Sequence, residues 1–173
     1  FPEAESIYRQ ILNADPDHPE ALHLLGVIAL QSGKNDHAVE FITKALAIKP
    51  DYAEAHNNLG LALQQQGRLN AAAACYEQSL AIKPDFDEAL SNLGDAQEEL
   101  GLLDEAVASH LEAIAIKPDF AEGWNNLRPT VKALHVSQAR EKGRDDPYQA
   151  GLSHAARATT DFAMLEYYLD SFR

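Results

Sequence analysis

The sequence has little cysteine, few cations and no long apolar run, and each shortage excludes a class of protein. Its 173 residues include one cysteine, Cys75, so neither an intrachain disulfide nor a cysteine-rich zinc site can form. No stretch reaches the roughly 18 consecutive apolar residues that a membrane-spanning helix needs. The 27 carboxylates outnumber 14 lysines and arginines, which gives a formal net charge of −13. We therefore expect neither membrane nor nucleic acid as a partner, because both bind basic surfaces.

The negative charge is concentrated in one segment of the chain. Residues 87–120 contain nine carboxylates and one lysine, a balance of −8 within the total of −13. Such a surface favours a partner that is basic or apolar. The alternative is that the surplus carboxylates only keep the protein soluble.

What the sequence does contain is a repeat of 34 residues. Four prolines follow one another at this spacing, and the last three lie within an identical AIKPD run. The prolines are Pro16, Pro50, Pro84 and Pro118. A fixed period of this length is typical of helix–turn–helix units that stack because none can bury its apolar face alone. With proline as position 32, the full repeats are 19–52, 53–86 and 87–120.

Other positions recur in the same register. Glycine occupies position 8, where we expect two helices to approach closely, and position 15, where we expect a left-handed residue to end the first helix. These glycines are Gly26, Gly60 and Gly94 at position 8, and Gly33, Gly67 and Gly101 at position 15. An aspartate before each repeat, followed three residues later by glutamate, as in Asp51 and Glu54, predicts a capping box at the start of each first helix.

These patterns resemble the tetratricopeptide repeat family. The matching runs are ALHLLG and ALSNLG in first helices and GRLNAAAACYEQSLAIKP as a second half, and the resemblance covers about two-thirds of the chain. It implies an all-α fold, a right-handed α-solenoid of helix–turn–helix repeats. In character the repeats are most similar to those of O-linked N-acetylglucosamine transferase-like bacterial proteins.

The two ends depart from the repeat. Residues 1–18 match only the second helix of a unit, which predicts a truncated repeat. Residues 121–141 begin as a fourth repeat, but we expect Pro129 to break it, since proline inside a helix removes a hydrogen bond. Residues 147–172 have an apolar stripe and predict a C-terminal helical cap for the solenoid.

The family resemblance implies that the first helix of each repeat lines a concave peptide-binding groove. Asparagine recurs at position 6 and forms a ladder whose amides could bind the backbone of an extended peptide. Alternatively, these asparagines hold neighbouring helices together. The predicted groove is apolar at its start and becomes acidic at Asp95, Glu98 and Glu99, which we call the acidic patch. The candidate groove residues are Leu24, Val27, Asn57, Asn58, Leu61, Gln64, Gln65, Asn92, Asp95, Glu98, Asn125 and Asn126.

Residues with catalytic or metal-binding chemistry are few. Glu20 and His23 have the spacing of a helical metal pair, but no second pair exists, so we expect no metal and no cofactor. His56 and His110 fall on core positions, where we expect partly buried, hydrogen-bonded side chains. No nucleophile and base motif is present, and we expect this chain not to be an enzyme.

The sequence therefore predicts a non-catalytic scaffold that binds a protein or an extended peptide, with a basic segment of the ligand over the acidic patch. The carboxylate clamp that the family uses for C-terminal tails needs cations at positions 2, 5 and 6, whereas position 2 here is glutamate. Two alternatives stay open: the recognition part of a larger glycosyl- or other group-transferase, and a scaffold that self-associates through its N-terminal half repeat or its C-terminal helix. The first residues, FPEAESIYRQ, lack the order of a secretory signal, and we expect a cytoplasmic protein.

Overall fold

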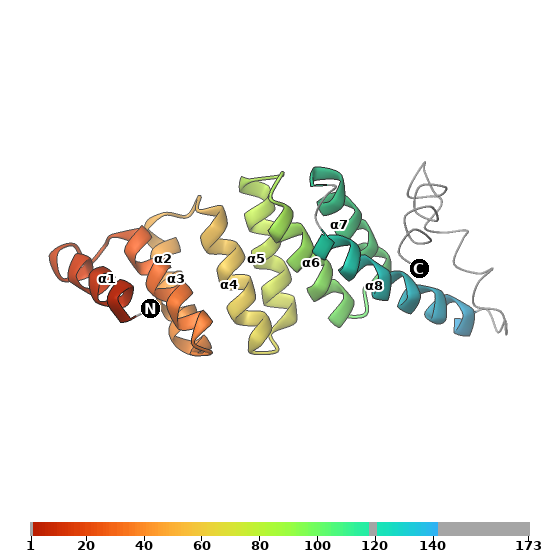
Figure 1. The fold of residues 1–173 in the computed structure, drawn as a ribbon, viewed down its shortest axis with the longest axis horizontal. Helices are drawn as coiled ribbons and strands as arrows, with labels where there is room; N and C mark the ends of the chain where they lie inside the picture. Colours follow the sequence, from red (N-terminus) through yellow and green to blue (C-terminus); the bar gives the residue numbers. More distant parts are fainter. Residues whose placement is uncertain (1, 118–120, 142–173) are drawn as a thin grey trace.

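The computed structural model describes residues 2–117 and 121–141 of the chain, and these form a row of α-helices. The helices are α1 (Pro2–Ala14), α2 (Pro19–Gln31), α3 (Asn35–Ile48), α4 (Ala53–Gln65), α5 (Leu69–Ile82), α6 (Asp87–Glu99), α7 (Leu103–Ile116) and α8 (Ala121–Glu141). They follow one another along an elongated molecule, from α1 at one end to α8 at the other (Figure 1). The described residues thus form the all-α solenoid that the sequence predicts.

Each helix packs mainly against its neighbours in sequence. The pairs α2/α3, α4/α5 and α6/α7 make the most extensive contacts, and α3/α4, α5/α6 and α7/α8 join one pair to the next. Helices α2, α4, α6 and α8 also contact one another directly along the row. Since α3, α5 and α7 approach one another less closely, the row containing α2 lies on the inner side of the solenoid.

The glycines have the two roles that the sequence predicts. Gly33, Gly67 and Gly101 end the first helices with φ angles of 69°, 72° and 79°. At each of them the chain makes the pair of backbone hydrogen bonds of a Schellman turn, as in Lys34 N to Ala29 O and Gly33 N to Leu30 O. These turns reverse the chain and bring the two helices of a repeat together.

Position 8 glycine allows the close approach within each pair. A Cβ atom on Gly60 would lie 2.5 Å from the Tyr76 ring, and one on Gly26 would lie 2.4 Å from Ile42. Tyr76 and Ile42 are fully buried, as is the alanine at position 20 in each repeat, for example Ala72. The core of each repeat therefore depends on two small residues that face one large residue at position 24.

The predicted capping boxes are wrong. Helices α4 and α6 begin one residue later than expected, with Tyr52 and Phe86 at the cap positions and no side-chain cap hydrogen bond. At α2 the cap is His18, whose Nδ1 accepts from Ala21 N at 3.3 Å. Phe86 is buried in the core, so aromatic packing between repeats takes precedence over a local aspartate cap.

The predicted break at Pro129 is also wrong, because α8 continues through it. Leu127, Val131 and Leu134, on both sides of the proline, pack with residues of α7 in one buried cluster. Burial of each such side chain contributes about 1.5–3 kcal/mol, which together exceeds the roughly 3 kcal/mol cost of an internal proline. Pro129 itself is exposed, so its ring points away from this core. The predicted cap at 147–172 lies outside the described residues.

Candidate functional site

The inner row of helices carries the residues that the sequence predicts as a binding surface, and we call the surface of α2, α4, α6 and α8 the inner face. Helices α2, α4 and α6 contain no lysine or arginine. Their carboxylates number one in α2, one in α4 and five in α6. The charge of the inner face therefore becomes strongly negative toward α6.

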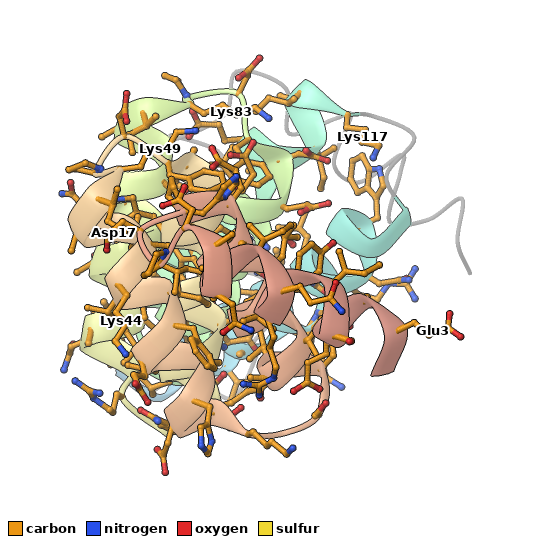
Figure 2. All side chains as sticks on the ribbon, turned by 90° about the vertical axis from the view of Figure 1, so that its left-hand side faces the viewer. Glu3, Asp17, Lys44, Lys49, Lys83 and Lys117 are labelled. Atoms are coloured by element: carbon orange, nitrogen blue, oxygen red, sulfur yellow. The ribbon has the colours of Figure 1, made fainter. Side chains whose placement is uncertain are left out.

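The lysines that follow the second helix of each repeat lie away from the middle of the inner face. Figure 2 views the row of repeats end-on, and Lys49, Lys83 and Lys117, which cap the C-terminal ends of α3, α5 and α7, all lie in its upper part. Lys49 Nζ donates to Glu20 Oε1 at 3.0 Å, and Lys83 Nζ lies 4.5 Å from the centre of the Phe86 ring. These contacts keep the lysines at the edge of the solenoid and off the middle of the inner face.

The asparagine ladder joins neighbouring repeats. Asn92 Nδ2 donates to Asn57 Oδ1 at 2.9 Å, and Asn58 Nδ2 lies 2.8 Å from His23 Nε2. Asn126 Nδ2 continues the series with a bond of 3.3 Å to the hydroxyl of Ser91. In each case an amide at position 6 contacts position 5 of the preceding repeat. This is the structural alternative that the sequence leaves open, and it occupies one donor of each ladder amide.

Position 5 is the part of this arrangement that sequence reasoning missed. Asn57 is one of the predicted groove residues, but its side chain is buried, with 3% of its surface exposed, and it accepts the bond from Asn92. His23 is buried as well and contacts the Tyr52 hydroxyl through Nδ1 at 2.9 Å. Burial lowers the pKa of His23, because a charged imidazolium loses hydration there. The recurrence of polar residues at position 5 was visible in the sequence and could have indicated these pairs.

The apolar candidates and two of the polar ones remain partly accessible. Leu24, Val27 and Leu61 are half-buried on the inner face, whereas Gln65 and Asn125 are exposed.

None of the described residues forms a cluster of three or more histidine, cysteine, aspartate or glutamate side chains that could hold a metal ion. Within the same described ranges, no helix has the length and apolar content to cross a membrane.

The acidic patch is tied to both neighbouring repeats. Gln64 Nε2 donates to Glu99 Oε1 at 2.6 Å, and Gln64 Oε1 in turn accepts from the Tyr76 hydroxyl at 2.8 Å. On the other side, Asn126 Nδ2 lies 3.4 Å from Asp95 Oδ2, and the Thr130 hydroxyl donates to Glu98 Oε2. Thr130 was not among the candidates, since the register of the repeat was expected to end at Pro129.

These bonds hold the three carboxylates in fixed positions and leave part of their surface accessible. The Asp95 side chain is 42% exposed, Glu98 is half-buried and Glu99 is exposed. A carboxylate can accept several hydrogen bonds, so these neutral donors do not by themselves exhaust its acceptor capacity. The α6 part of the inner face thus carries three ordered carboxylates, whereas the parts formed by α2 and α4 carry half-buried leucines.

Sequence models of the tetratricopeptide repeat match residues 28–67, 63–101 and 89–122, which together span more than half of the chain. The chain belongs to the tetratricopeptide repeat family. No curated protein matches this tetratricopeptide chain in sequence.

Several solved structures share its fold. A crystal structure of MamA has a TM-score of 0.69 and 24% identity over 89% of this chain and 88% of its own. The first TPR of Spaghetti (RPAP3), bound to the HSP90 peptide SRMEEVD, has a TM-score of 0.66 and 24% identity over 67% of this chain and 92% of its own. The Sgt2 TPR domain from Aspergillus fumigatus has a TM-score of 0.67 and 20% identity over 74% of this chain and 85% of its own. At these identities the likeness supports the fold.

Proposed function

We propose that this chain is a non-catalytic scaffold that binds a protein or an extended peptide on its inner face, with a basic segment of the ligand over the acidic patch. The observation that carries the proposal is the charge of the first three helices of the inner face: α2, α4 and α6 lack lysine and arginine, and α6 carries three ordered carboxylates. A partner of opposite charge is favoured because complementary potentials speed association and select the partner.

The RPAP3 domain offers a useful contrast. Its HSP90 peptide, SRMEEVD, has three carboxylate side chains and one arginine, so it is acidic. In the present chain, positions 2, 5 and 6 of the second repeat are Glu54, Asn57 and Asn58, which offer no cation to an acidic tail. A peptide of this kind would meet like charge near the acidic patch, which costs binding free energy. We infer that the preferred ligand has the opposite charge.

Selection from a random peptide library, followed by calorimetry of the selected peptides, tests this function. We expect enrichment of lysine and arginine, and an affinity that falls as salt rises from 50 to about 500 mM, because exposed charges are screened. The variant Asp95→Asn/Glu98→Gln keeps the acceptors for Asn126 and Thr130 but removes two charges, and it should weaken binding about tenfold. The matched control is Glu105→Gln/Glu112→Gln, which removes two charges from exposed positions of α7.

Two results would contradict the proposal. One is enrichment of acidic peptides, and the other is equal loss of affinity in both double variants, which would indicate an unspecific response to net charge. The alternatives of a transferase recognition module or a self-associating scaffold gain no specific support from the described residues. Sedimentation at several protein concentrations would identify self-association as a concentration-dependent increase in mass.

A further inference from the structure

A buried histidine lies directly behind the acidic patch. His110, on α7, is fully buried and occupies position 24, where the first two repeats have Ile42 and Tyr76. Its ring packs against Gly94, where a Cβ atom would lie 2.5 Å from Cε1. The third repeat therefore has an ionisable group at a site that its neighbours fill with an apolar side chain or a phenol.

His110 also lacks the hydrogen bond that position 24 makes in the second repeat. Tyr76 donates to Gln64 at position 12, but the residue equivalent to Gln64 is Glu98, which accepts from Thr130 instead. Among the described residues, neither ring nitrogen of His110 has a hydrogen-bond partner. The sequence-based expectation of a hydrogen-bonded histidine is therefore wrong here, because imidazole is shorter than phenol and does not reach across the helix pair.

The unpartnered ring points toward the acidic patch. His110 Nε2 lies 3.7 Å from Asp95 Oδ1, and the Asp95 side chain as a whole is 42% exposed. Burial lowers the pKa of His110, and the nearby Glu98 carboxylate opposes this shift. The imidazole is therefore neutral at pH 7.5 and adds no positive charge beside these carboxylates.

The other groups around this pair come from α5, α7 and α8. From α8, Asn126 and Thr130 contact the two carboxylates, and the charged Arg128 of the same stretch is exposed. From α5, burial raises the pKa of the Tyr76 phenol, and the charge of Asp95 adds to this shift. On α7 itself, the nearest acidic positions, Glu105 and Glu112, are exposed. Asp95 and Glu98 are therefore the two carboxylates for which the structure gives a direct interaction with His110, by a distance of 3.7 Å for Asp95 and by an opposing effect on its pKa for Glu98.

We propose that His110 is an internal, proton-dependent competitor for the cationic segment that binds Asp95 and Glu98. This inference rests on the proposed function of the inner face. When His110 takes up a proton, an imidazolium lies 3.7 Å from Asp95 Oδ1 and neutralises part of the charge that the ligand needs. Ligand and proton then oppose each other, and the opposition is reciprocal: bound cation must disfavour protonation of His110.

The test uses an acetylated, amidated hexa-arginine peptide with a fluorophore, titrated against the full chain at 150 mM salt. For the wild type we expect Kd to increase from pH 7.5 to pH 5.5 by up to about fivefold, which is the lower end of typical couplings between two sites and would be reached when His110 is fully protonated. His110→Ile and His110→Tyr copy the residues of the first and second repeats, so one of them should be accommodated. In the His110 variant that folds, the ratio of Kd at pH 5.5 to Kd at pH 7.5 should be less than two. We attribute any pH dependence that is left to the other histidines.

A control variant and a second measurement test the role of His110 separately from peptide binding itself. His56→Gln, which alters a partly exposed histidine that contacts the Pro50 carbonyl, should keep the wild-type ratio. The NMR titration of the His110 imidazole should move to lower pH when the peptide is saturating. Equal Kd ratios in wild type and His110 variants, an unmoved titration, or a loss of helicity that parallels the loss of binding would each overturn the inference. Absence of binding at pH 7.5 would instead overturn the proposed function, and the inference with it.

Discussion

Truncation of one ladder asparagine should cost folding stability before it costs binding. In Asn92→Ala, Asn57 loses the donor that lies 2.9 Å from its Oδ1. Asn57 is 3% exposed, so water cannot easily replace this donor, and a buried acceptor left unpaired costs about 1–3 kcal/mol. The better helix propensity of alanine returns roughly 0.5 kcal/mol. We expect the free energy of unfolding to fall by about 1–2 kcal/mol, measured by urea denaturation at pH 7.5.

The matched control is Asn125→Ala, which makes the same substitution at an exposed position of α8. It should be neutral or slightly stabilising, so the difference between the two variants isolates the hydrogen bond. The double variant Asn57→Ala/Asn92→Ala removes donor and acceptor together, and it should lose less stability than the sum of the single variants. If Asn92→Ala is as stable as Asn125→Ala, the ladder does not hold the repeats together, and a direct role in ligand binding regains its support.

Three further predictions concern the core and its response to pH. Gly60→Ala places a methyl group 2.5 Å from the Tyr76 ring. It should lower the free energy of unfolding by about 1–3 kcal/mol in the same urea assay, because the packed core has no room for the added atom. An unchanged free energy of unfolding would mean that α4 and α5 can move apart without cost. In Gly67→Ala the new methyl group meets no atom within 4 Å, but the residue must keep a φ of 72°. The free energy of unfolding should therefore fall by about 1–2 kcal/mol through backbone strain alone. D-alanine at this position, introduced by chemical synthesis, should restore the stability. Burial lowers the pKa of His23 below its ordinary 6.5, so the unfolded chain takes up a proton more readily than the folded protein. The free energy of unfolding should therefore be highest above pH 6.5 and fall below it. In His23→Gln this fall between pH 7.5 and 5.5 should be smaller.

The repeat, its register and its glycines could be predicted because local rules determine them. A left-handed turn at Gly67 needs glycine whatever surrounds it, and a 34-residue period identifies the unit that repeats. The same local rules failed at the helix starts, where aromatic side chains such as Phe86 enter the core and move the cap by one residue. They also failed at Pro129, because the packing of Leu127 and Val131 outweighs a missing backbone bond.

The candidate site was only partly predictable for a related reason. Residue types at position 6 indicated a polar ladder, but whether its amides face a ligand or the preceding repeat depends on how far one repeat is rotated against the next. That rotation places Asn92 against Asn57, which is why a predicted groove residue is buried. The contact of Thr130 with Glu98 likewise depends on a helix that the sequence predicted to be broken.

The most direct test of the central claim is a map of the bound ligand on the chain. A selected basic peptide with a nitroxide at its cationic end should broaden backbone amide signals of α6 and α8, with the strongest effect around Asp95 and Glu98, and leave the outer helices α3 and α5 unchanged. Broadening centred on α3, α5 or the outer side of α7 would contradict the assignment of binding to the inner face.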